Sequence, residues 1–264
     1  MRPVLLFSAL TLVLSWTYWL GVIASQRGWL AVSVPLTPFG AFGPALAAIA
    51  ITGLLHGRRG VGELLRSIAA RPVPWRTLGI SMLAWPSFVL IALLFAGLLG
   101  QPLAPTAELP LTRLLLGVVE VFLLTALAEE LGWRGFLLPH LLTRVRPAVA
   151  ATVVGGIWAL WHLPLFYIPG TAEASIPFGL FVINILAASF IYTAFFLCSR
   201  PSLLPALTLH TFQDVSLGLA PVLWPAAGTS AAFWYAYFAV VLAVGLGAAG
   251  RLIARPPTSS PAAA

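Results

Sequence analysis

Apolar segments about as long as a bilayer is thick follow one another through almost the whole chain. A helix needs about 20 predominantly apolar residues to cross a membrane. We count about eight such segments, at residues 4–24, 38–56, 77–99, 113–137, 148–168, 176–198, 202–221 and 229–250. In lipid every backbone polar group must bond within the protein, which leaves helices or closed barrels. We therefore predict an all-α fold, a polytopic transmembrane helical bundle of about eight helices.

The composition supports this prediction and excludes several other classes of protein. Of the 264 residues, 60% are hydrophobic and only 8% are charged, whereas soluble domains contain about 25% charged residues. The single cysteine, Cys198, excludes an internal disulfide and a multi-cysteine metal site. We expect one integral membrane bundle over residues 1–254 and, because the end of the chain is polar and rich in proline, a disordered tail at 255–264.

The arginines indicate how the bundle is oriented. The net charge is +7, and all the basic residues are arginines that cluster between the apolar segments, which favours a topology signal over a nucleic-acid partner. With the N-terminus in the cytoplasm, only Arg27 and Arg113 fall on the far side, and Arg134 lies inside the fourth segment. Cytoplasmic loops carry an excess of Lys and Arg. We therefore expect a multi-pass protein of the cell membrane, in contact with lipid, with both termini cytoplasmic.

Two adjacent glutamates interrupt the fourth segment. Ionisable residues at membrane depth are costly and usually functional. Glu130 and Arg134 are four residues apart, the favourable order for an ion pair on one helix face. Glu129 lies about 100° around the helix from Glu130. The spacing predicts that Glu130 and Arg134 form a structural brace, while Glu129 faces a cavity and is suited to act as a base. The alternative is that both glutamates only anchor Arg134.

Two further segments carry histidines at comparable depth. His162 follows Trp158 by one helical turn and precedes Pro164, and His210 and Asp214 share one face of the seventh segment. Each group also has a purely structural interpretation, as a hydrogen-bonded core histidine or as a buried pair that fixes a helix. A carboxylate, two imidazoles and a further acid that converge in lipid are more typical of a site that activates water than of an ion path.

Three motifs in this order resemble those of the CPBP family, which includes CAAX prenyl endopeptidases and bacteriocin-processing (Abi) proteins. The family pattern is E-E-x-x-x-R, F-x-x-x-H and H-x-x-x-N/D. The matching residues are Glu129, Glu130 and Arg134, then Trp158 and His162, then His210 and Asp214. The resemblance places a protease core at about residues 113–221. Trp158 stands where the family more often has Phe, and Asp214 stands where the Ras-converting enzymes have Asn.

The resemblance implies an intramembrane endopeptidase, a hydrolase that cleaves a membrane-associated peptide or protein, including lipidated ones. It implies that Glu129 and His162 activate water, that His210 and Asp214 stabilise the oxyanion, and that Glu130, Arg134 and Trp158 support the site. It implies no cofactor, although Glu129, His162 and His210 match the residue types of a zinc triad. The alternative functions are a non-proteolytic scaffold or immunity protein, or a proton-coupled transporter. The absence of a visible internal repeat weakens the transporter interpretation.

Overall fold

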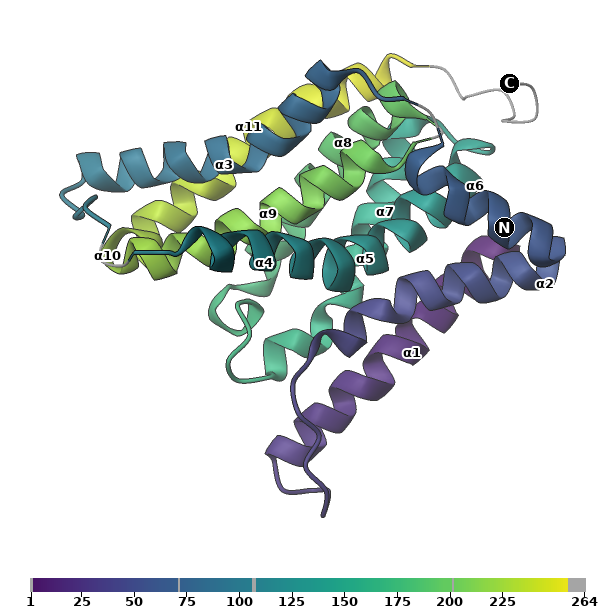
Figure 1. Ribbon diagram of the computed structural model, residues 1–264, viewed down its shortest axis with the longest axis horizontal. Helices are drawn as coiled ribbons and strands as arrows, with labels where there is room; N and C mark the ends of the chain where they lie inside the picture. The colour runs from purple at the N-terminus through teal and green to yellow at the C-terminus, as the bar shows by residue number, and fades with distance from the viewer. Residues whose placement is uncertain (1, 71, 106–107, 201, 256–264) are drawn as a thin grey trace.

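A computed structural model describes residues 2–70, 72–105, 108–200 and 202–255 (Figure 1). All the regular secondary structure of these residues is helical, which confirms the predicted all-α bundle. Residues 256–264, most of the segment predicted to be a disordered tail, lie outside the described residues.

Seven helices of 15 or more residues form the bundle together with one composite rod. The seven are α1 (Arg2–Gln26), α2 (Gly43–Arg66), α3 (Trp75–Leu98), α7 (Pro147–Trp161), α8 (Phe178–Ser199), α9 (Leu204–Leu223) and α11 (Ala231–Ile253). The rod comprises α4 (Leu111–Val121), η3 (Phe122–Ala126), α5 (Leu127–Gly132), η4 (Trp133–Leu137) and α6 (Leu138–Leu142). The connections contain η1 (Pro38–Phe42), η2 (Ser67–Ala69), η5 (Leu163–Tyr167), η6 (Glu173–Ser175) and α10 (Pro225–Gly228).

Among the described residues, 7 helical segments are long and apolar enough to cross a membrane. They correspond to every predicted segment except 202–221. That segment is helical as α9, but His210, Gln213 and Asp214 make it less apolar than the other helices. α9 packs against α3 and α8. The part of the chain that the structure describes therefore has seven strongly apolar helical segments and a further helix, α9, that carries polar side chains into the bundle.

α9 runs from one end of the bundle to the other. At its start, the backbone N–H of Leu203 donates to the carbonyl of Ser67 in η2, at 2.8 Å. At its end, the indole N–H of Trp224 donates to the carbonyl of Leu103 between α3 and α4, also at 2.8 Å. In Figure 1 the first turn of α1 and the last turn of α11 lie toward the same side of the bundle.

Small residues bring α7, α8 and α11 close together. A Cβ atom added to Gly155 on α7 would lie 2.9 Å from the Cβ of Ser189 on α8. A Cβ added to Gly245 on α11 would lie 2.7 Å from that of Ala187. The hydroxyl of Ser189 also donates to the carbonyl of Ala151 at 2.8 Å. Close backbone approach at small residues and hydrogen bonds between helices are typical of packing in membranes.

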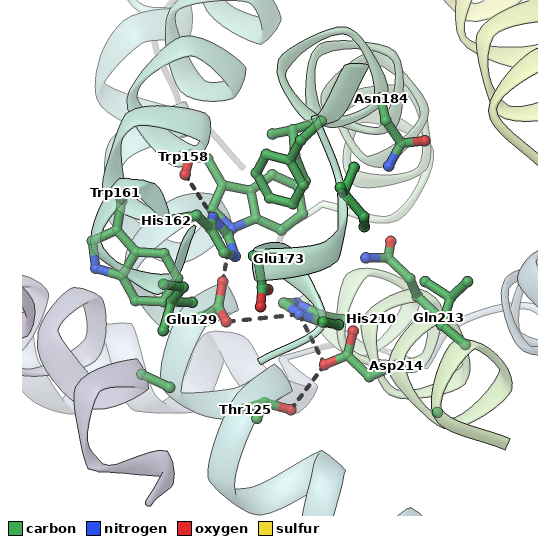
Figure 2. A pocket seen from close by; sticks show the side chains of 18 of the residues that line it. Thr125, Glu129, Trp158, Trp161, His162, Glu173, Asn184, His210, Gln213 and Asp214 are labelled. Carbon is green, nitrogen blue, oxygen red and sulfur yellow. Dashed lines mark hydrogen bonds and ion pairs between the residues drawn. The ribbon is translucent and has the colours of Figure 1, made fainter. Parts of the chain in front are cut away.

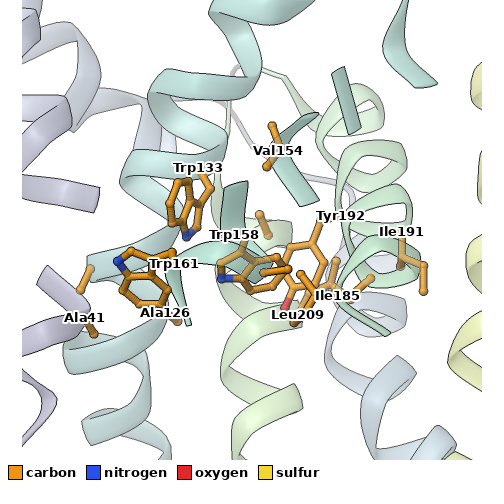
Figure 3. Close-up of a cluster of buried hydrophobic side chains, with 14 of the residues drawn as sticks. Ala41, Ala126, Trp133, Val154, Trp158, Trp161, Ile185, Ile191, Tyr192 and Leu209 are labelled. Atoms are coloured by element: carbon orange, nitrogen blue, oxygen red, sulfur yellow. The ribbon is translucent and has the colours of Figure 1, made fainter. Parts of the chain in front are cut away.

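Two π-helical segments, η3 and η4, flank the short helix α5 that carries both glutamates. π-helical turns are rare and frequently mark functional sites. α2 packs directly on α5. A Cβ atom added to Gly132 on α5 would lie only 2.5 Å from the Cβ of Pro44 on α2, so glycine allows this close approach. Beside α5, buried aromatic side chains form the core shown in Figure 3, including Trp133, Trp158 and Tyr192.

Candidate active site

Glu129 lies on α5 with its two carboxylate oxygens in different surroundings. Oε2 accepts hydrogen bonds from the indole N–H groups of Trp158, at 2.7 Å, and Trp133, at 3.3 Å. Oε1 accepts no hydrogen bond and lies 3.9 Å from Nε2 of His210. The two indoles therefore hold the carboxylate in place and leave Oε1 available to a water or a substrate.

His162 is the residue at which α7 ends and the 3₁₀-helix η5 begins. The helix ends here because Pro164 cannot donate a backbone hydrogen bond. Nδ1 of His162 lies 2.8 Å from the carbonyl oxygen of Trp158. A carbonyl only accepts, so Nδ1 carries the proton, and in the neutral ring Nε2 presents a lone pair. Nε2 makes no hydrogen bond to a described residue, and His162 lines the cavity described below.

Glu130 contacts two basic side chains, those of Arg134 and His210, behind the site. Its Oε1 accepts from Arg134 at 2.8 Å, and it lies 2.9 Å from Nδ1 of His210. The side chains of Glu130 and Arg134 are both fully buried. Nε and the second terminal nitrogen of Arg134 have no hydrogen-bond partner, but its guanidinium lies 4.6 Å from the ring of Trp158 and 4.2 Å from that of Tyr192. Cation–π contacts thus complete the surroundings of this charge.

Asp214 lies one turn after His210 on α9 and is the most accessible of the site carboxylates. Its Oδ2 lies 3.5 Å from Nε2 of His210, and the Asp214 side chain is 31% exposed. The hydroxyl of Thr125 in η3 lies 3.2 Å from the same oxygen. His210 therefore has a carboxylate near each ring nitrogen, Glu130 on one side and Asp214 on the other, so its ring plane is fixed.

One cavity of about 460 Å³ brings these groups together. Figure 2 shows Glu129, His162, His210 and Asp214 around it, at the meeting point of α5, α7 and α9. Trp158 connects the first two, because its indole binds Glu129 and its carbonyl binds His162. The remaining walls are mainly apolar and aromatic, and two loops, around Thr37 and Glu173, also line the cavity.

The predicted zinc alternative can be compared with this geometry. Within the described ranges, no three side chains of His, Cys, Asp or Glu are arranged as metal ligands. Glu129, His162 and His210 all line the cavity. Nδ1 of His210 is bonded to Glu130, Nδ1 of His162 is bonded to a carbonyl, and Oε2 of Glu129 is bonded to two indoles. These bonds fix the orientation of the three side chains and leave Nε2 of each histidine and Oε1 of Glu129 for other contacts.

Comparison with known proteins finds similarity over the part of the chain that carries the three motifs. Residues 110–216 match a protein family described as "Type II CAAX prenyl endopeptidase Rce1-like". A curated relative, "CAAX prenyl protease 2" of Methanococcus maripaludis, is 28% identical over 156 residues, which cover 56% of this chain and 58% of the relative. The segment of the chain that carries the three motifs is therefore similar to this family of CAAX prenyl endopeptidases. The chain matches less than two thirds of the length of this relative.

Two positions at which the chain departs from the family pattern have visible consequences in the structure. Trp158 donates a hydrogen bond to Glu129, which a phenylalanine at this position cannot do. Asp214 places a second carboxylate beside His210, where an asparagine would offer an amide donor. Both changes alter the hydrogen bonding of the proposed catalytic groups.

Several residues that line or support the site were not predicted from the sequence. Gln213 accepts a hydrogen bond from the hydroxyl of Tyr192 at 3.1 Å, and it lines the cavity together with Asn184, Thr125 and Glu173. Asn184 could have been found, because it is a lone amide within the apolar segment 176–198. Glu173 carried no comparable signal, since it lies in a connecting segment whose path only the fold determines.

Proposed function

We propose that the chain is an intramembrane endopeptidase that hydrolyses a peptide bond of a membrane-associated peptide or protein. One observation carries this proposal: Trp158 holds a carboxylate and an imidazole at the same cavity. Its indole binds Oε2 of Glu129, and its carbonyl binds Nδ1 of His162. Oε1 of Glu129 and Nε2 of His162 are left without hydrogen bonds at a cavity large enough for a peptide segment.

In the proposed reaction these two groups activate a water molecule. Glu129 removes a proton from the water, His162 accepts a second hydrogen bond from it, and the oxygen attacks the peptide carbonyl carbon. General bases of this kind typically accelerate reactions by about 10²–10⁴-fold. The C–N bond then breaks, and the proton taken from the water passes to the leaving nitrogen. Water is the only co-reactant, so the products are a carboxylic acid and an amine.

His210 is the proposed donor to the oxyanion of the tetrahedral intermediate. Its Nδ1 bonds to Glu130, so a proton on Nε2 is directed toward the cavity, where charge develops. Donors that are already oriented stabilise such charge without further reorganisation. Asp214 lies 3.5 Å from the same nitrogen and is proposed to orient the ring. Glu130 and Arg134 are proposed to support the helix that carries Glu129.

The proposal includes no metal cofactor. Two His and a Glu resemble zinc ligands in type, but a water held between Glu129 and His162 needs no metal to reach the peptide carbonyl. Purified protein should therefore cleave its substrate after dialysis against a chelator.

The orientation in the membrane is also part of the proposal. The excess of arginine in the connections on one side of the bundle favours a cytoplasmic position for both termini. The loop of residues 27–37 and the segment around Glu173 then lie on the opposite side, and both contribute residues to the cavity. The substrate would reach the cavity from that side or from within the lipid.

The first experiment is cleavage of a peptide library by the purified protein in detergent or lipid discs. The name of the M. maripaludis relative suggests including prenylated CAAX peptides beside unmodified ones. We expect cleavage that is lost in Glu129→Gln and retained in Glu63→Gln, a matched change at an exposed position. A properly folded protein that cleaves no peptide would favour the scaffold or transporter alternatives.

A further inference from the structure

Glu173 adds an acidic side chain to the cavity from outside the three motifs. It lies in η6, the short turn between α7 and α8, and Figure 2 shows its side chain directed toward Glu129 and His210. It forms no ion pair with a described residue. Burial raises the pKa of Glu173, a hydrogen bond from its own backbone lowers it, and the nearby Asp214 raises it again. The carboxylate therefore lacks a cation that would stabilise its charge.

The charges that line the cavity do not balance. Three carboxylates line it, those of Glu129, Glu173 and Asp214, and two imidazoles, those of His162 and His210. Neither arginine nor lysine is among the lining residues. His210 can offset one carboxylate, while His162 in the form described above is neutral. Arg134 lies behind the cavity and is already paired with Glu130. Acidic side chains in the cavity thus outnumber the groups there that can carry a positive charge.

The rest of the lining fits the same kind of ligand. Seven large aromatic side chains line the cavity: Trp19, Trp158, Trp161, Phe181, Trp234, Tyr237 and Phe238. Aromatic faces attract cations and also pack against the apolar stems of long basic side chains. Asn184 also lines the cavity. Carboxyl groups and aromatic walls together suit a group that brings N–H donors and a positive charge.

We propose that Glu173 is a specificity-determining residue that binds a basic side chain of the substrate, arginine or lysine, close to the scissile bond. This proposal rests on the proposed peptidase function and names the substrate class of the same cavity. The basic head group would pair with Glu173, and its apolar stem would contact the aromatic wall. The peptide carbonyl would remain beside Glu129 and His162.

Peptides that contain either arginine or citrulline test this proposal directly, since citrulline has nearly the same shape without the charge. In the native protein we expect kcat/KM to be at least about tenfold higher for the arginine peptide, because hydrogen bonds to charged groups are the stronger class. In Glu173→Gln this ratio should fall to near one, whereas Glu173→Asp should retain part of it. Glu108→Gln is the matched control, because Glu108 is an exposed glutamate of another loop, and it should keep the full ratio.

A binding assay distinguishes failure of this proposal from failure of the proposed peptidase function. Fluorescence anisotropy with the Glu129→Gln protein measures the affinity for both peptides without cleavage. A preference for the arginine peptide that disappears in Glu129→Gln/Glu173→Gln supports the role of Glu173 even if no cleavage is ever observed. Equal affinities for the two peptides, or a preference that survives the Glu173 change, would overturn the proposal. A melting temperature close to that of the native protein confirms that each variant is folded.

Discussion

Replacement of Glu130 by glutamine should destabilise the protein strongly, because Arg134 would keep its charge in a fully buried position. Glu130 provides the one hydrogen bond to Arg134, at 2.8 Å, and also contacts His210 at 2.9 Å. The other guanidinium nitrogens have no hydrogen-bond partner that could take over. Breaking a buried pair on one side typically costs about 3–5 kcal/mol. At about 2–4 °C per kcal/mol for a chain of this size, the melting temperature should fall by roughly 6–20 °C.

The protein contains its own control for this experiment. Arg59 and Glu63 are also four residues apart on a helix and form an ion pair at 3.1 Å, but their side chains are 89% and 57% exposed. Exposed helix pairs of this kind contribute about 0.3–0.5 kcal/mol. Glu63→Gln should therefore leave the melting temperature almost unchanged. The two variants make the same chemical change, so burial is the main difference between them.

A double variant tests the cause. Glu130→Gln/Arg134→Met removes both charges, and replacement of a whole buried pair by apolar groups is often close to neutral. It should regain most of the lost stability in a thermal unfolding assay in detergent. Activity should stay low, because His210 still lacks its carboxylate partner. If Glu130→Gln melts at the same temperature as Glu63→Gln, the structural role assigned to Glu130 is wrong.

Further predictions concern individual contacts of the site. Trp158→Phe should retain the melting temperature within a few degrees but lower kcat about tenfold or more, because it removes a hydrogen bond to a charged group; an unchanged kcat would show that this bond is dispensable. Asp214→Asn should retain substantial activity, because the amide oxygen can still accept a hydrogen bond from Nε2 of His210 and orient the ring; an inactive variant would mean that the carboxylate is required. Elemental analysis should find well under one zinc per chain, and chelators should leave turnover intact; stoichiometric zinc with chelator-sensitive turnover would reverse the metal assignment. In a Cys198→Ser background, Ser33→Cys should be labelled only from outside the cell and Thr143→Cys only from inside, and labelling of both from one side would contradict the topology.

The sequence allowed the local part of this site to be predicted. Hydrophobic length identified the helices, and the helical repeat placed Glu130 beside Arg134 and His210 beside Asp214. Both contacts occur in the structure. They were predictable because residues four apart on one helix meet whatever the tertiary fold is.

Contacts between distant segments were not predictable in the same way. The bond from Glu130 to His210 joins residues 80 positions apart, and the position of Glu173 depends on how the turn between α7 and α8 folds back over the cavity. The π-helical turns on either side of α5 were also missed, since an extra residue in a helical turn leaves no mark in an apolar sequence. α9 is less apolar than expected for a membrane span because it supplies polar side chains to the site.

The rate at which Glu129→Gln cleaves a peptide that the native protein cleaves tests the central claim most directly. Glutamine keeps an acceptor for the indoles of Trp158 and Trp133, so the fold and the melting temperature should persist. Single-turnover cleavage at saturating peptide should fall by at least about 100-fold, the lower range for loss of a general base. A Glu129→Gln protein that cleaves within about threefold of the native rate would contradict the assignment of Glu129 as the group that activates water.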